Sequence, residues 1–179
     1  MYSKVKIAGH PLHPMLVAFP VTLYVVTLAC FLAYALGGGP YWFRSGVYAN
    51  LAAVILAAVA AVPGFVDWAF GIPARTPAKS TGIAHMLLNV VSLVVFLVNV
   101  VSTWGHRLDV APRVGASVVL PLVGVIVTVL AGFLGWKLVQ THHVGVDLTP
   151  EQERLEPRPT PPAEEPGRTP HAHHGPLGA

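Results

Sequence analysis

The sequence predicts an all-α membrane protein: a four-helix bundle built from two duplicated helical hairpins, followed by a disordered C-terminal tail. Three observations lead to this prediction. Only 11% of the 179 residues are charged and 54% are hydrophobic, whereas a soluble domain has about 25% charged residues. Four long stretches contain no Asp, Glu, Lys or Arg. Short motifs from the first half of the chain also recur in the second half, which indicates an internal duplication.

Each uncharged stretch reaches the roughly 20 residues that an α-helix needs to cross the hydrocarbon core of a bilayer. The apolar residues are continuous, whereas the strands of a membrane barrel alternate apolar and polar residues. Pro14 is well placed to begin the first helix, because proline is favoured in the first helical turn. We therefore expect a membrane domain over residues 1–147, with four spans at about 15–36, 46–66, 84–104 and 114–139.

Residues 148–179 are rich in Pro, Glu, Arg and His and contain few large apolar residues. A segment of this composition cannot bury enough surface to fold alone, so a disordered tail is predicted. Cys30 is the single cysteine, which excludes an intramolecular disulfide. The basic residues are scattered over short loops rather than gathered in a patch. The expected partner is therefore the lipid bilayer and not a nucleic acid.

The charges near the ends of the spans predict the orientation. The face that carries both termini has more Lys and Arg than the opposite face, and such an excess marks the cytoplasmic side. We expect a multi-pass protein of the inner, or cell, membrane with both termini in the cytoplasm. The two sets of basic residues are Lys4, Lys6, Arg75, Lys79 and Lys137 on the first face, and Arg44, Arg107 and Arg113 on the other.

The duplication places two histidines in equivalent positions. His13 opens the first span and His85 opens the third, and further matching motifs lie at offsets of about 70 residues. Since each copy holds two spans, both copies enter and leave the membrane on the same face. His13 and His85 should then lie at one depth, related by a pseudo-twofold axis along the membrane normal. The other matching motifs are Arg44–Gly46 with Arg113–Gly115, and Gly64–Trp68 with Gly132–Trp136, an alignment that puts Gly135 opposite Asp67.

Six ionisable residues are expected on the membrane face that carries the termini. Ionisable groups at membrane depth are costly, and they tend to face the bundle interior and serve a function. The alternative is that these groups lie at the interface, where water reduces the cost. The duplication favours a functional cluster. Its members are His10, His13, Asp67, His85, His142 and His143.

Three spans carry a stripe of small or polar residues at helical spacing, with successive steps of three and four residues. Such stripes predict the faces that line the interior of the bundle. The alternative is that small and amide residues only hold the helices together. The stripes are His85, Asn89, Ser92, Phe96, Asn99 and Thr103 in the third span; His13, Val17, Pro20, Tyr24 and Thr27 in the first; and Pro121, Gly124, Thr128, Ala131, Gly135 and Val139 in the fourth.

The leading hypothesis is that His13 and His85 hold a redox centre, a b-type haem, for electron transfer to or from a redox partner protein. Helices across the diagonal of a square bundle are roughly 13 Å apart, a spacing that suits a haem with two axial imidazoles. Other residues are assigned supporting roles in this hypothesis. His10, His142 and His143 are alternative ligands; Asp67 and Asn89 are supporting residues near the centre; Ala60, Gly64, Ala131, Gly132 and Gly135 leave room for the macrocycle; and Arg75 or Lys79 meets its propionates.

Two other functions remain open. His10, His13, Asp67 and His85 supply ligands of the kind that copper, zinc or iron accepts, so the protein could bind or transport a transition-metal ion. In that setting Asp67 either orients a histidine or pairs with Lys79 or Arg75. The third possibility is a non-catalytic scaffold or assembly subunit. No hydrolase motif or phosphate-binding glycine loop occurs, so an autonomous enzyme is not expected.

The opening Gly9–Pro14, with Asp67–Trp68 and Ala84–His85, resembles an uncharacterised family of bacterial integral membrane proteins. That family is a domain of unknown function with four predicted spans, and the resemblance covers roughly residues 7–147. Some relatives carry a Rieske-type iron–sulfur domain, which implies a setting in electron transfer. This chain cannot form such a centre itself, because a Rieske site needs two cysteines and Cys30 is alone.

Overall fold

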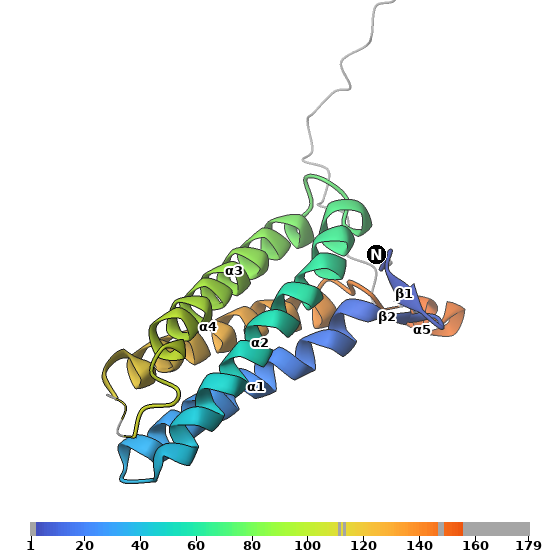
Figure 1. Ribbon diagram of the computed structural model, residues 1–179. Coiled ribbons are helices and arrows are strands. Elements are labelled where there is room, and N and C mark those ends of the chain that lie inside the picture. Colours follow the sequence, from blue (N-terminus) through green and yellow to red (C-terminus); the bar gives the residue numbers. More distant parts are fainter. Residues whose placement is uncertain (1–2, 111, 113, 147–148, 156–179) are drawn as a thin grey trace, which may run out of the picture. The chain divides into compact units, whose positions relative to one another are not determined.

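The computed structural model describes residues 3–110, 112, 114–146 and 149–155. Four long helices run side by side (Figure 1). All four are long and apolar enough to cross a membrane. The predicted fold class is confirmed. The helices are α1 (Leu12–Ala35), α2 (Pro40–Val66), α3 (Pro77–Trp104) and α4 (Gly115–Gln140).

Helices α1, α2 and α3 begin earlier than the uncharged stretches suggest, whereas α4 begins within one residue of its predicted start. Both α2 and α3 start at a proline, Pro40 and Pro77, a residue whose fixed φ suits the first turn. Arg44 and Lys79 lie in these early turns, so a limit set by the first charge misses them. Helix α1 starts at Leu12 rather than at Pro14, which places His13 inside its first turn.

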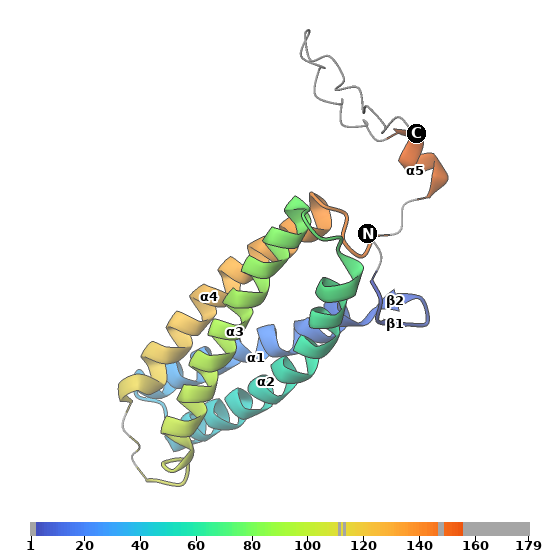
Figure 2. The same cartoon turned by 90° about the horizontal axis from the view of Figure 1, so that it is seen from above.

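The four helices form a square. Helix α1 packs mainly on α2, and α3 mainly on α4; weaker contacts join α1 to α4 and α2 to α3. Helices α1 and α3 therefore lie across the diagonal, as Figure 2 shows from a second direction. We call the end of the bundle where α1 and α3 begin the histidine end, and the opposite end the distal end.

The interior is narrow and partly polar, whereas the outside is apolar. Ser92, Asn99 and Thr128 are buried, while large apolar side chains such as Val101 and Val129 are exposed. Apolar outer faces are expected of helices whose solvent is lipid. The predicted interior stripes are confirmed apart from Asn89 and Val139, which are exposed.

Short elements complete the histidine end. Strands β1 (Lys6–Ile7) and β2 (His10–Pro11) form an antiparallel hairpin before α1. Ala8 and Gly9, at its turn, both have positive φ, which a two-residue hairpin turn of this hand requires. The π-helical segment η1 (Asp67–Gly71) extends α2.

Residues from Leu148 onward form a separate unit. Within it, the helix α5 (Pro150–Leu155) lies where the composition predicts a disordered tail. Residues 156–179, the rest of that predicted tail, lie outside the described residues.

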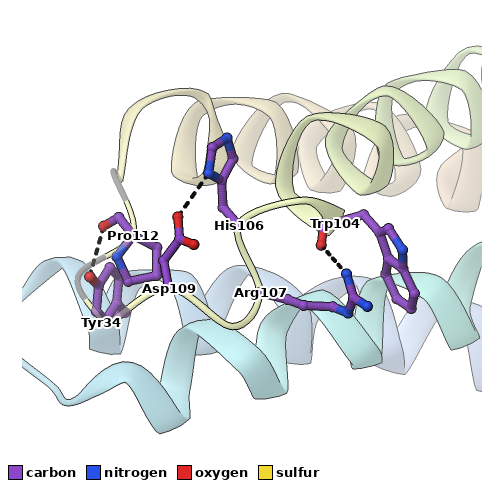
Figure 3. A network of polar contacts seen from close by, with 6 residues as sticks. All are labelled: Tyr34, Trp104, His106, Arg107, Asp109 and Pro112. Atoms are coloured by element: carbon purple, nitrogen blue, oxygen red, sulfur yellow. Dashed lines mark hydrogen bonds and ion pairs between the residues drawn. The ribbon is translucent and has the colours of Figure 1, made fainter.

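The distal end carries a loop between α3 and α4 that is held by polar contacts (Figure 3). Nδ1 of His106 lies 2.9 Å from a carboxylate oxygen of Asp109. Arg107 donates to the Trp104 carbonyl and lies over the Trp104 ring. The hydroxyl of Tyr34, near the end of α1, donates to the Pro112 carbonyl at 2.7 Å. This hydrogen bond joins the loop between α3 and α4 to α1.

Candidate functional site

The structure brings His13 and His85 together across the diagonal of the bundle, as the duplication predicts. Their ring centres are 6.4 Å apart and their planes meet at 86°. The two side chains come from the first turns of α1 and the third turn of α3, at the histidine end. Two equivalent imidazoles therefore share one position in the bundle.

Each ring is fixed by the second helix of its own hairpin. Nδ1 of His13 donates to the Ala60 carbonyl at 2.9 Å, and Nδ1 of His85 donates to the Ala131 carbonyl at 2.8 Å. A carbonyl only accepts, so Nδ1 carries the proton and a neutral ring keeps its lone pair on Nε2. Histidines that ligate metals are held in this way, with the second nitrogen bonded to a carbonyl or carboxylate.

Two glycines make room for the rings. A Cβ atom on Gly64 would lie 2.7 Å from Cε1 of His13, and one on Gly135 would lie 3.0 Å from Cε1 of His85. The space directly above these two glycines is therefore filled by the imidazole rings. Gly132 has no atom within 4 Å of the corresponding position and faces outward.

These contacts correct the alignment of the two copies. The structure pairs Ala60 with Ala131 and Gly64 with Gly135, because each pair performs the same task. Matching the motifs by letter instead sets Gly64 against Gly132. The true counterpart of Asp67 is then Leu138 and not Gly135.

Asn89 contacts His85 although it lies on an exposed part of α3. Its amide nitrogen donates to the His85 carbonyl at 2.8 Å and lies 3.2 Å from Nε2 of the same residue. The amide can thus donate to the lone pair of that nitrogen. Asn89 positions the ring of His85, and the equivalent residue near His13 is Val17.

Asp67 holds the N-terminal segment rather than a histidine or a cation. Its carboxylate accepts hydrogen bonds from the Ser3 hydroxyl at 2.8 Å and from the backbone amides of Lys4 at 2.6 Å and Val5 at 3.1 Å. Three donors on one carboxylate form a strong anchor. The pairing with Lys79 or Arg75 that the sequence suggests is replaced by this clamp. Ser3 carries no sequence signal that would have identified it.

The two basic residues of the second connection behave differently. Lys79 directs its ammonium group to the backbone carbonyls of Trp68, Ala69 and Ile72 and lies 4.2 Å from the centre of the Trp68 ring. It closes the end of η1. Arg75 is exposed at the histidine end.

The remaining histidines have local partners. Nδ1 of His10 lies 2.9 Å from the Ala8 carbonyl in the exposed β-hairpin. Nε2 of His142 lies 3.5 Å from the Thr81 hydroxyl, and His143 has a positive φ in the turn after α4. Among the described residues, no group of three or more His, Cys, Asp or Glu side chains could hold a metal ion. The predicted four-residue metal set is therefore not assembled.

Sequence reasoning missed the two groups that orient the histidines. They are the backbone carbonyls of Ala60 and Ala131. Every residue has a backbone carbonyl, so the sequence does not show which ones accept a hydrogen bond. The only available signal is the small size of both residues on the inner face of a helix.

Residues 9–148 match a protein family described as "Predicted membrane protein (DUF2231)". No curated protein matches the chain, and no solved structure does.

Proposed function

Since the chain belongs to the DUF2231 family of predicted membrane proteins, we propose that it binds a b-type haem between His13 and His85 and serves in electron transfer. The observation that carries the proposal is the pair of imidazoles, each anchored through Nδ1 and related by the duplication. When bound, haem supplies a one-electron iron couple whose potential depends on its axial ligands.

The spacing of the rings fits two ligands on one metal atom. A metal–nitrogen bond of about 2 Å on each side, with about 1 Å from each nitrogen to its ring centre, gives ring centres about 6 Å apart. The observed separation is 6.4 Å. His13 and His85 are thus close enough to act on opposite sides of one centre.

The number of ligands favours haem over a bare ion. Protein sites for zinc use three or four side chains, and the described residues assemble two histidines without a third His, Cys, Asp or Glu. Haem iron needs only axial ligands from the protein, because the macrocycle supplies the others. Arg75, exposed at the histidine end, would be the residue that binds a propionate.

The surrounding residues tune the pair. The carbonyls of Ala60 and Ala131 fix the tautomer of each ring and raise the basicity of Nε2. The Asn89 amide would give up its contact with Nε2 of His85 when that nitrogen binds iron, because the nitrogen has a single lone pair, and would keep its hydrogen bond to the His85 carbonyl. Apolar helices around the site keep bulk water away. A redox partner protein would exchange electrons at the histidine end, where the site lies nearest the surface.

The test is an optical spectrum and iron analysis of the full chain, produced with sufficient haem and purified in mild detergent. We expect a Soret band and about one haem per chain, lost in His13→Ala and His85→Ala. His10→Ala and His142→Ala are the matched controls and should retain haem.

A wild-type protein without a Soret band or stoichiometric iron contradicts the proposal. In that case, stoichiometric copper or zinc that depends on His13 and His85 would assign the metal-ion function. A protein with neither haem nor metal would be a scaffold subunit.

A further inference from the structure

A layer of aromatic residues in the middle of the bundle fixes the relative levels of the helices. The rings of Tyr24 in α1 and Phe96 in α3 stack with their centres 3.7 Å apart and an interplanar angle of 7°. Ala53 of α2 packs against both. A Cβ on Gly124 of α4 would lie 2.5 Å from the Phe96 ring. All four helices therefore meet at this aromatic layer.

A polar layer follows directly on the distal side. Thr27, Asn50 and Asn99 each lie three residues from Tyr24, Ala53 and Phe96, in the direction of the distal end. Residues three apart share a helix face about 4.5 Å further along the axis. The exposed fraction of all three polar residues is 0%. Three helices thus direct a polar side chain into one closed level of the interior.

The two amides of this layer lack partners. Both side-chain atoms of Asn50 and both of Asn99 are buried without a hydrogen bond to any described residue, and so is the hydroxyl of Tyr24 in the adjoining aromatic layer. Thr27 donates to the Leu23 carbonyl at 2.7 Å, and its oxygen can still accept. Within a hydrocarbon span, each unsatisfied polar group costs about 2 kcal/mol or more.

Helix α4 adds an acceptor at the same level. Pro121, three residues before Gly124, is buried in α4. Because proline has no N–H, the carbonyl of Ser117 does not receive its usual helical hydrogen bond. The layer therefore offers amide donors together with amide, hydroxyl and backbone acceptors.

We propose that the layer formed by Thr27, Asn50 and Asn99 is a binding site for water inside the membrane span. Water both donates and accepts and typically makes about three hydrogen bonds to buried polar groups, which matches this mixture. An ion does not fit, because the layer contains no charged residue to compensate it.

The polar layer lies in the same interior as the histidine pair, with the aromatic layer and a pair of hydroxyl groups between them. On the histidine side of the aromatic layer, the hydroxyls of Ser92 and Thr128 lie 2.6 Å apart. Thr128 is three residues before Ala131, the partner of His85. Water in the polar layer thus places exchangeable protons within the same interior column as the histidine pair. This site does not depend on whether the histidines bind haem.

The test is X-ray radiolytic footprinting of the full chain in phospholipid vesicles containing ¹⁸O-labelled water. Hydroxyl radicals formed from bound water oxidise the side chains that touch it. Phe96 is the reporter beside the polar layer. Phe43 is the matched control, since it is equally buried but lies seven residues, or two helical turns, from Asn50 in an apolar cluster with Phe31 and Val47.

We expect the ¹⁸O labelling rate of Phe96 to exceed that of Phe43 at least fivefold, and to fall to the Phe43 level in the Asn50→Leu/Asn99→Leu variant. Equal rates at Phe96 and Phe43 in the wild type overturn the proposal. Unchanged labelling in a folded double variant overturns it as well. If the variant does not fold, the wild-type ratio alone decides.

Discussion

Gly64 lies directly against the imidazole of His13, at a distance that leaves no room for a methyl group. A Cβ there would come within 2.7 Å of Cε1, far closer than carbon atoms approach without repulsion. The ring cannot retreat without losing its hydrogen bond to the Ala60 carbonyl. The glycine and the carbonyl, one helical turn apart in α2, therefore determine together where His13 lies.

The first prediction concerns this glycine. Gly64→Ala should push the His13 ring off the Ala60 carbonyl and destabilise the protein by about 1–3 kcal/mol, as overpacking does. Thermal unfolding in detergent measures the change. The control is Gly132→Ala, which meets open space and should leave stability unchanged or raise it by up to about 1 kcal/mol. Equal melting of the two variants would contradict the close contact between Gly64 and the His13 ring.

The second prediction concerns the clamp of the N-terminal segment. Asp67→Ala removes the acceptor for the Lys4 and Val5 amides, and these amides should exchange hydrogen at least tenfold faster, since a lost hydrogen bond to a charged group is worth about 1.5–3 kcal/mol. Hydrogen exchange with mass spectrometry reports this directly. Asp109→Ala, in the distal loop, is the control and should leave the N-terminal amides unchanged. Unaltered exchange in Asp67→Ala contradicts the clamp.

The third prediction concerns Lys79. Lys79→Met keeps an apolar stem but removes the ammonium group that caps two carbonyls of η1 and the carbonyl of Ile72 just after it, so we expect a loss of about 2 kcal/mol in stability. A change in the fluorescence of Trp68 should accompany it, because the cation over that ring is gone. Lys137→Met, on the exposed side of α4, is the matched control. Comparable melting temperatures for both variants would disprove the capping role.

The fourth prediction concerns the distal loop. Tyr34→Phe deletes the hydroxyl that bonds the Pro112 carbonyl and should cost about 1 kcal/mol. Hydrogen exchange should quicken in residues 105–110 while the helices stay protected. Tyr41→Phe, at an exposed tyrosine, should have no effect. Faster exchange in both variants, or in neither, argues against this tether.

The sequence predicts the helices well because the bilayer imposes one simple requirement on them. Length and lack of charge identify the four spans, and the repeated histidines predict that His13 and His85 meet. The first inference depends on the thickness of the bilayer and the second on the duplication, and both leave a regular pattern in the sequence. The helix starts are less accurate, since Arg44 and Lys79 sit in first turns near the interface, where charge is tolerated.

The details of the site depend on contacts that residue type does not encode. The acceptor atoms for His13 and His85 belong to the backbone, so the side chains in the sequence do not identify them. Asp67 looks like a partner for a nearby cation, yet the amides of Lys4 and Val5 reach it first. Asn89 follows the polar stripe by spacing but is exposed, whereas Ser92 and Phe96 further along α3 are buried.

Each histidine is held by its own hairpin: His13 and its acceptor both come from α1 and α2, and His85 and its acceptor both come from α3 and α4. Half of the chain is therefore a complete half-site. The centre requires only that two such halves meet, and it makes no difference to these contacts whether one chain or two supplies them. A single hairpin that paired with its own copy would have had the same pair of imidazoles, so fusion of the two halves added no new local chemistry. What fusion permits is divergence, and Asn89 on one side with Val17 on the other marks where the halves have already become unequal.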